Sequence, residues 1–253
     1  MKPAPASNNF LVLIPAFNEA GAIADVVREV KKVVPNARIL VVDDASKDDT
    51  VNLAKGAGAG VLCLPYHLGL GGCVQAGYRM AYELGYDYVI RVDGDGQHDP
   101  RYIMELLKVL RTSGVHMVIG SRFYQHNGEH TSILRAIGIG LFRLVLRPIL
   151  GQSVHDPTSG FVGVNREALQ VFSQSFPLEY PEIEALVVLQ RKRFRFQEVP
   201  CKMRPRQAGR SSITAVKSLY YIIHVLLGVF VNVLKFEGRQ RKIAAEKDGK
   251  KKD

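Results

Sequence analysis

The stretch YVIRVDGDGQHDP (residues 88–100) runs from an apolar segment into a cluster of aspartates. Its apolar start is typical of a strand buried on both faces of a parallel sheet. Carboxylates packed this closely repel one another unless a cation lies among them. Asp99 precedes Pro100 and a helical repeat of apolar residues, so we expect it to cap a helix. That leaves Asp93 and Asp95, a D-x-D pair of the kind that turns hard oxygen ligands toward Mg²⁺ or Mn²⁺.

Similar strand and helix signals lie on both sides of this stretch. The apolar runs FLVLIPA, RILVVDD, GVLCLPY and MVIGSRF alternate with segments of helical periodicity. This alternation predicts an open, mostly parallel α/β sheet with helices on both faces. Ligands of such sheets bind beyond the carboxyl ends of the strands. The aspartates of VVDDAS and RVDGDG fall at those ends.

The composition excludes several classes of protein. An apolar content of 47% excludes wholesale disorder. The chain has no Trp and only 8% aromatic residues, which gives no stacking platform for single-stranded nucleic acid. The net charge of +10 suits phosphorylated small molecules or an anionic membrane surface as well as nucleic acid. We expect no nucleic-acid partner, because charge alone would not explain paired aspartates at a sheet edge.

Cysteine spacing and the N-terminus point to a cytoplasmic protein. Cys63, Cys73 and Cys201 show no C-x-x-C spacing, so we expect reduced, mostly buried thiols. Residues 1–9 lack the regions of a signal peptide and are expected to be flexible. The segment after the first strand, PAFNEAG, lacks the G-x-G-x-x-G fingerprint, which excludes a nicotinamide-type dinucleotide domain.

The second half contains two apolar segments of a different kind. A helix over about residues 131–150 would gather Arg135, Arg143 and Arg147 on one side, as in a helix at a membrane interface or a core helix with a basic rim. Residues 219–234 are almost continuously apolar, but a helix of ~24 Å is shorter than the ~30 Å hydrocarbon core. We therefore expect residues 214–235 to form a membrane-associating helix that lies shallowly or docks, followed by a disordered basic tail at 236–253.

Other polar residues have ordinary structural interpretations. Asp43 is expected to end a strand, and Asp48 or Asp49 to cap the next helix. The acidic residues Glu179, Glu182 and Glu184 are interpreted as helix-start charges. No metal-ligand spacing supports a zinc site among the histidines His98, His126, His130 and His155.

Several motifs in collinear order resemble one family. They are LVLIPAFNEAGAI, VVDDASKDDT, HLGLGGCVQAGYRMA, RVDGDGQHDP, VIGSRF, DPTSGFVGVNREAL and EVPCKMRPRQAGRSSI. The chain resembles family-2 glycosyltransferases of the GT-A fold, and within them the polyprenyl-phosphate sugar synthases, which include dolichyl-phosphate mannose synthase. The resemblance covers residues 10–213, which we expect to form one GT-A domain.

The resemblance implies a role for each matching residue. Positions that hold the donor base and ribose are Pro15, Phe17, Glu19 and Asp44, and the glycine-rich segment adds Gly71 to the donor nucleotide site. The positions that bind the metal and donor diphosphate are Asp93, Asp95 and Gln97. Acceptor phosphate-binding positions are Arg122, Arg204 and, as a looser match, Arg135. Asp156 begins DPTSGF, a motif near the acceptor. We expect catalysis to depend on Asp93, Asp95, Arg122 and Asp156.

The implied reaction moves a hexose or N-acetylhexosamine, with inversion, from a GDP or UDP sugar to polyprenyl phosphate. A lipid monophosphate is largely ionised near pH 7, so this acceptor needs no general base. One alternative is a hydroxyl acceptor on a polysaccharide or glycolipid, for which Asp156 or a nearby acid would serve as the base. A second is a sugar-phosphate nucleotidyltransferase, although PAFNEAG lacks its glycine- and arginine-rich loop.

Membrane attachment is a separate expectation. Larger members of the family carry C-terminal transmembrane helices that this sequence lacks. The apolar segments, or a small membrane-anchoring partner protein, would then hold the enzyme at the cytoplasmic face of the cell membrane, on an anionic surface.

Overall fold

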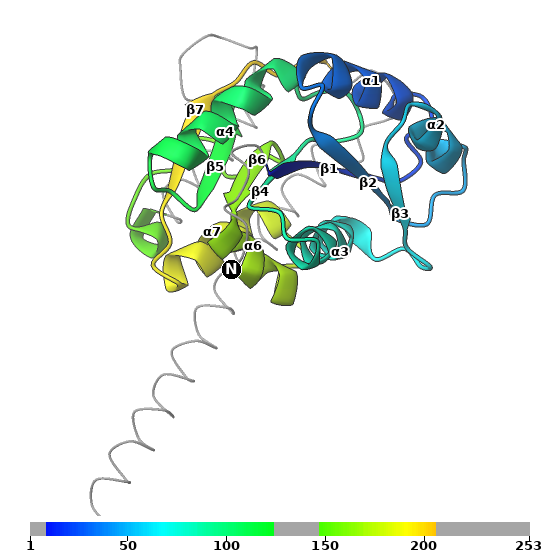
Figure 1. Ribbon diagram of the computed structural model, residues 1–253. Helices are drawn as coiled ribbons and strands as arrows, with labels where there is room; N and C mark the ends of the chain where they lie inside the picture. The colour runs from blue at the N-terminus through cyan, green and yellow to red at the C-terminus, as the bar shows by residue number, and fades with distance from the viewer. Residues whose placement is uncertain (1–8, 124–146, 206–253) are drawn as a thin grey trace, which may run out of the picture.

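A computed structural model describes residues 9–123 and 147–205 and shows a single mixed sheet (Figure 1). Its seven strands have the order β3-β2-β1-β4-β6-β5-β7. Strands β1, β2, β3 and β4 pair in parallel, as do β5 and β7. The strand bounds are β1 Phe10–Ala16, β2 Arg38–Asp43, β3 Gly60–Cys63, β4 Tyr88–Arg91, β5 Met117–Ser121, β6 Val162–Asn165 and β7 Phe196–Pro200.

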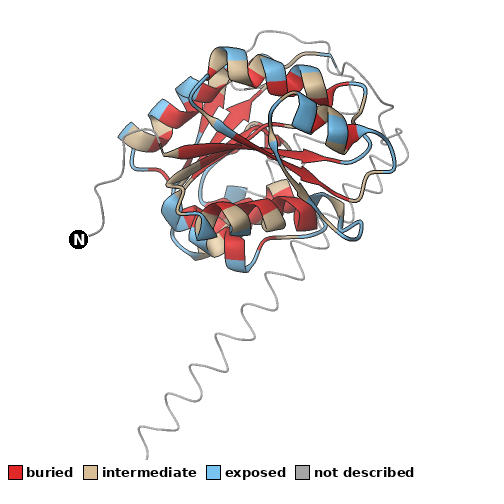
Figure 2. Cartoon of the chain, turned by 45° about the vertical axis from the view of Figure 1, so that its right-hand side comes forward, coloured by how far each residue is buried: buried red, intermediate tan, exposed pale blue. Residues whose placement is uncertain are grey.

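Helices cover both faces of the sheet (Figure 2). The α1, α2 and α4 helices pack on one face, and α3, α6 and α7 on the other. This arrangement confirms the predicted fold class. The helix bounds are α1 Ile23–Val33, α2 Thr50–Gly56, α3 Gly69–Glu83, the 3₁₀ turn η1 Pro100–Tyr102, α4 Ile103–Thr112, α6 Arg166–Gln174 and α7 Pro181–Arg191.

Strand β6 runs against its neighbours, which the sequence pattern did not reveal. It pairs antiparallel with β4, where Arg91 faces Val162, and with β5, where Ile119 also faces Val162. The start of β6 therefore lies at the same edge as the ends of β4 and β5. The residues that precede β6 are brought to the carboxyl edge of the sheet by this reversal.

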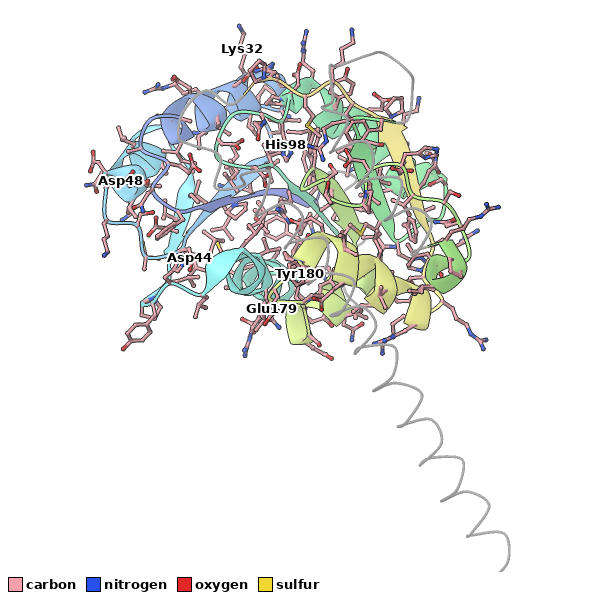
Figure 3. All side chains as sticks on the ribbon, turned by 180° about the vertical axis from the view of Figure 1, so that it is seen from behind. Lys32, Asp44, Asp48, His98, Glu179 and Tyr180 are labelled. Carbon is pink, nitrogen blue, oxygen red and sulfur yellow. The ribbon has the colours of Figure 1, made fainter. Side chains whose placement is uncertain are left out.

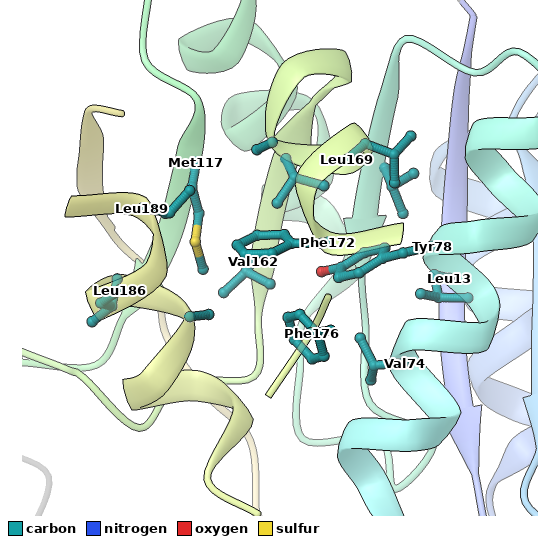
Figure 4. Close-up of a cluster of buried hydrophobic side chains, with 14 of the residues drawn as sticks. Leu13, Val74, Tyr78, Met117, Val162, Leu169, Phe172, Phe176, Leu186 and Leu189 are labelled. Carbon is teal, nitrogen blue, oxygen red and sulfur yellow. The ribbon is translucent and has the colours of Figure 1, made fainter. Parts of the chain in front are cut away.

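Aromatic rings fill the core between α3 and α6 (Figure 4). Tyr78 meets Phe176 edge-to-face with ring centroids 5.3 Å apart, and Phe172 meets Phe176 at 5.1 Å. These are favourable arrangements of aromatic quadrupoles. Gly77 lets α3 approach β1, because a Cβ atom there would lie 2.4 Å from Leu13 Cδ1. The helix is thereby held close to the strand that leads into PAFNE.

The cysteines behave as structural thiols. Cys73 and Cys201 are buried, whereas Cys63 is exposed. Burial raises the pKa of both buried thiols to about 12, so they stay protonated near neutral pH.

Asp99 caps a helix as predicted, but it does more than cap. Its carboxylate accepts the backbone N–H of Arg101 at 3.0 Å, with Pro100 at the first position of the turn. The same carboxylate pairs with the side chain of Arg101 and lies 3.0 Å from the guanidinium of Arg204. Burial alone would raise the pKa of Asp99, but the hydrogen bonds from Arg101 and the charge of Arg204 lower it to about 2.

We expect Asp99→Asn to remove a pH-dependent part of the stability. A carboxyl group with a lowered pKa in the folded state stabilises that state above its unfolded pKa of about 3.9, and this contribution is lost as the pH falls toward 2. Asn keeps the cap on the Arg101 N–H but loses the charge that faces Arg101 and Arg204, so wild type should exceed the variant in free energy of unfolding at pH 6 by about 1–3 kcal/mol. The difference should shrink between about pH 4 and 2. Urea unfolding at several pH values measures it, and a constant difference would contradict the assignment.

Candidate active site

The loops after β1 and β2 are tied to each other at the carboxyl edge. The backbone N–H of Asn18 donates to Ser46 Oγ at 2.8 Å, and Asn18 Oδ1 accepts the N–H of Lys47 at 2.8 Å. Asn18 and Ala45 both have positive φ, of 55° and 59°. Strained backbone of this kind persists only where surrounding contacts hold it, and it concentrates at functional sites.

These loops place the side chains predicted to hold the nucleotide. Asp44 is buried and accepts the backbone N–H of Leu68 at 2.7 Å, which fixes it beside the start of α3 (Figure 3). The other oxygen of Asp44 lies 2.9 Å from His67 Nδ1. The ring of Phe17 is partly exposed and lies 4.2 Å from that of His67. His67 is the first residue of the motif HLGLGGCVQAGYRMA, but it was not predicted as a site residue.

The remaining predicted nucleotide residues have clear structural positions. Pro15 is buried in β1, and Glu19 donates its backbone N–H to Thr50 Oγ1 at 2.8 Å. Gly71 packs against another loop, because a Cβ there would come within 2.4 Å of the backbone of Leu178. This contact gives Gly71 a packing role, and its assignment to the nucleotide stays a prediction.

The D-x-D segment forms a tight loop after β4. Asp95 is buried, and its Oδ1 accepts the backbone N–H of Gln97 at 3.0 Å. Gly96 between them has a φ of 79°, a conformation that favours glycine. The carbonyl of Gln97 accepts the backbone N–H of Arg204 at 2.8 Å. The loop is thus held at both ends, with the side chain of Asp93 one-third exposed.

Arg91 supplies the cation that the aspartate cluster requires. It is buried in β4, with its guanidinium 3.3 Å from Asp93 Oδ1 and 2.8 Å from Glu182 Oε1. Burial by itself lowers the pKa of Arg91, but the two carboxylates raise it above its ordinary value. Glu182 and Glu184 do lie in the first turn of α7, as predicted. Glu182 is also an ion-pair partner, which sequence spacing could not reveal.

His98 supports Asp93 from the other side. Its Nδ1 accepts the backbone N–H of Asp93 at 3.0 Å, and its ring stacks on Phe161 with centroids 4.8 Å apart. Burial lowers the pKa of His98 below its ordinary value, so the ring is neutral near pH 7. Because Nδ1 is the acceptor, the proton lies on Nε2, which is 3.6 Å from Asp93 Oδ2.

Arg122 and Asp156 form a bidentate pair beside this loop. Arg122 Nε and Nη2 each lie 2.7 Å from one oxygen of Asp156, and the backbone N–H of Arg122 also donates to that carboxylate. Asp156 is buried, and its backbone N–H donates to Glu198 Oε1 at 2.7 Å. His155 pairs with the same glutamate at 2.8 Å. Glu198 is the first residue of the motif EVPCKMRPRQAGRSSI but was not predicted as a site residue, and it fixes the start of the DPTSGF motif.

Arg204 has strong partners of its own. Its guanidinium makes two hydrogen bonds of 2.7 Å to Glu29 and lies 3.0 Å from Asp99. These contacts fasten the segment after β7 to α1. A role for Arg204 in binding an acceptor phosphate stays a prediction.

Some predicted features lie outside the described residues. They include Arg135, most of the predicted interface helix, His126, His130 and the segments 1–8, 214–235 and 236–253. Residues 147–150, the end of that predicted helix, are helical. Within residues 9–123 and 147–205, no helix is long and apolar enough to cross a bilayer.

The donor set fits a cation that also binds a diphosphate. In the described part of the chain, no three His, Cys, Asp or Glu side chains gather as a closed metal site. Asp93 and Asp95 instead offer two carboxylates at one strand end. Mg²⁺ is commonly held by one or two carboxylates together with substrate phosphates and water. This donor set suits such a cation and not a structural zinc.

Comparison with known proteins places this site in context. The sequence profile of glycosyl transferase family 2 matches residues 11–172. The chain is 38% identical over 117 residues to an undecaprenyl-phosphate mannosyltransferase of Micrococcus luteus, a match that covers 44% of this chain and 47% of the relative. It is 28% identical over 214 residues to a UDP-N-acetylglucosamine–dolichyl-phosphate N-acetylglucosaminyltransferase of Methanococcus voltae, covering 76% and 84%.

A solved structure shares the fold. Glucosyl-3-phosphoglycerate synthase from Mycobacterium tuberculosis, crystallised with Mn²⁺, UDP-glucose and phosphoglyceric acid, superposes with a TM-score of 0.67. The two sequences are 26% identical, and the match covers 87% of this chain and 79% of that one. The same enzyme was also crystallised with Mg²⁺ and UDP.

We expect Gly160→Ala to disturb Asp93 more than the fold. A Cβ at Gly160 would lie 2.7 Å from both Arg91 Nη2 and Asp93 Oδ2, so these groups must move. The stability cost should be about 1–3 kcal/mol. Titration calorimetry should show weaker Mn²⁺ binding in the presence of a nucleoside diphosphate. Gly56→Ala is the matched control, since its Cβ would meet nothing within 4 Å. Equal Mn²⁺ affinity in all three proteins would contradict the expectation.

Proposed function

Because the chain belongs to glycosyl transferase family 2, we propose that it moves a hexose or N-acetylhexosamine from a nucleoside-diphosphate sugar to polyprenyl phosphate. One observation carries this proposal: the carboxylate pair Asp93 and Asp95 shares a sheet edge with the Arg122–Asp156 ion pair. The motif that holds Asp156 continues to Gly160, which lies close to Asp93, since an added Cβ there would be 2.7 Å from Asp93 Oδ2. Donor and acceptor groups would therefore meet across this loop.

The donor side would be built by the loops after β1, β2 and β4. Phe17 presents a partly exposed ring suited to a nucleobase, and buried Asp44 lies beside it at the end of β2. Asp93, Asp95 and Gln97 would hold Mg²⁺ or Mn²⁺ together with the diphosphate. When bound, the cation neutralises the negative charge that develops on the departing diphosphate. The structures of glucosyl-3-phosphoglycerate synthase with Mn²⁺ or Mg²⁺ support this assignment.

The geometry at Asp156 favours a phosphate acceptor. A hydroxyl acceptor requires a base, and Asp156 was the first candidate. Its side chain is 0% exposed and both oxygens contact Arg122, so a substrate hydroxyl could reach it only by displacing that arginine. An ionised phosphate needs no base, only cations to align it and an open anomeric face. Arg122 is suited to this role because its side chain is 29% exposed and its guanidinium has donors in addition to the Nε and Nη2 groups that bind Asp156.

A hydroxyl acceptor is the second candidate. Glucosyl-3-phosphoglycerate synthase shares the fold and was crystallised with phosphoglyceric acid. A small phosphorylated acceptor of that kind could use the same arginine. The relatives named for undecaprenyl phosphate and dolichyl phosphate favour the lipid.

A lipid acceptor would require a peripheral position of the enzyme at the cytoplasmic face of the membrane. We propose that residues 10–213 form the transferase domain and that the apolar segment 214–235, the basic tail or a small anchoring partner supplies attachment. A polyprenyl phosphate would then present its headgroup while its tail stays in the bilayer. The basic tail would add roughly 1 kcal/mol for each well-placed cation near anionic lipid.

Removing either carboxylate of the D-x-D pair should abolish transfer. Asp93→Ala and Asp95→Ala each delete an oxygen ligand for the cation, and excess chelator should have the same effect in wild type. Transfer of labelled sugar from a panel of GDP and UDP sugars measures the loss. Asp25→Ala is the control, because that exposed carboxylate lies on α1 and pairs only with Arg28 in the described structure. Full transfer in chelator would remove the metal from the proposal.

The identity of the acceptor is tested by the chemical identity of the product and by substitutions of Arg122. Wild type with anionic vesicles containing polyprenyl phosphate should give a sugar on a mild-acid-labile phosphodiester. Arg122→Ala should lower transfer to lipid far more than nucleotide binding, and Arg122→Lys should restore it only partly, because lysine lacks the planar fork. Thermal unfolding of each Arg122 variant is measured in parallel, because these substitutions change the ion-pair partner of the buried Asp156.

Arg79→Ala is the control for this series, because Arg79 is an exposed arginine on α3. An acid-stable glycoside on a hydroxyl would favour the second candidate. If the protein does not pellet with the vesicles at low salt, attachment must come from a partner protein.

A further inference from the structure

Arg91 is shared by two carboxylates of different function. Its Nη2 donates to Glu182 at 2.8 Å, and the same atom and Nε lie 3.3 Å from Asp93 Oδ1. Arg91 is 2% exposed, Glu182 12% and Asp93 33%. The better hydrogen bond thus goes to the more deeply buried carboxylate, and the longer contact goes to the one at the proposed cation site.

The surroundings prevent Arg91 from turning away. Gly160 lies close to its guanidinium, because an added Cβ there would be 2.7 Å from Nη2. Glu182 is anchored in the first turn of α7, where Pro181 and Ile183 are buried on either side of it. The guanidinium is therefore confined between β4, α7 and the DPTSGF loop.

We propose that Glu182 is a positioning residue that sets the cation affinity of Asp93. It does so by forming an ion pair with Arg91, which weakens the attraction between Arg91 and Asp93. This inference deepens the proposed function and rests on it, because the cation is the one that binds the donor diphosphate. A guanidinium beside a carboxylate competes with any metal for that carboxylate. By binding Arg91, Glu182 weakens this competition and leaves Asp93 able to bind a divalent cation without an isolated charge in the core.

A purely structural ion pair would behave differently. Replacing both members of a buried pair by neutral residues of similar size is often harmless to stability. If the pair only supports the fold, cation affinity should follow stability in every variant. If Glu182 modulates the cation affinity of Asp93, that affinity should depend on the charge beside Asp93 and not on the stability of the variant.

The test is Mn²⁺ binding in the presence of UDP or GDP, measured by electron paramagnetic resonance of free Mn²⁺. In Glu182→Gln, Arg91 keeps only Asp93 of these two carboxylate partners and competes more strongly with the cation. The dissociation constant for Mn²⁺ should therefore rise about tenfold, which is the scale on which a close charge changes the proton affinity of a carboxylate. Glu184→Gln is the matched control, since it removes a carboxylate from the same first turn of α7. That control should bind Mn²⁺ as wild type does.

A neutral double variant keeps the test decisive if Glu182→Gln unfolds. Arg91→Met/Glu182→Gln removes both opposite charges, so the competing cation is gone and Mn²⁺ should bind at least as tightly as in wild type. Circular dichroism establishes that each variant is folded. Weaker binding by the double variant, or unchanged binding by folded Glu182→Gln, overturns the inference.

The wild-type titration separates this inference from the proposed function. If wild type binds no Mn²⁺ with either nucleotide, the metal-dependent function is wrong and the inference fails with it. If wild type binds Mn²⁺ and Glu182→Gln binds it equally, only the role of Glu182 is wrong.

Discussion

Charge balance at the carboxyl edge of the sheet is the constraint on which this structure depends. Three aspartates follow β4 within a few residues, and each is held by a different kind of partner. Asp93 faces Arg91, Asp95 binds the backbone of its own loop, and Asp99 pairs with two arginines as well as capping a turn. Most of these partners are neighbours in the chain, but Arg204 comes from the segment after β7, and Glu182 of α7 pairs with Arg91. The complete set of ion pairs around this loop therefore forms only when the sheet, α7 and the segment after β7 are all in place.

Charges are also balanced on the acceptor side, but there the burial of the two charges is reversed. There an arginine is partly exposed and a carboxylate is buried behind it, and Glu198 fixes that carboxylate through two backbone N–H groups. Arg122 is thus pre-positioned by a rigid support before any ligand arrives. Pre-organised donors lose little freedom on binding, which is the usual physical basis of strong recognition of phosphate.

The sequence predicted the sheet and its helices because unbroken apolar strands alternate with amphipathic segments. It also predicted the cap at Asp99, which depends only on neighbours in the chain. It did not reveal the direction of β6, since a short apolar run reads alike in both directions. Glu182 was interpreted as a helix-start charge, which is correct locally and incomplete, because its partner Arg91 lies far away in sequence. The assignment of Arg204 had the same weakness, since Glu29 is visible as its partner only in three dimensions.

The reversal of β6 has an evolutionary consequence. Strand β5 ends and β6 begins at the same edge, with Ile119 opposite Val162, so the long connection between them leaves and rejoins the sheet at nearly one point. An insertion or deletion in such a connection changes neither the register nor the order of the strands. The elements that hold the donor can then stay constant while the part of this connection that precedes Asp156 diverges. Descendants of one ancestral donor site could in this way acquire new acceptors without rebuilding the sheet.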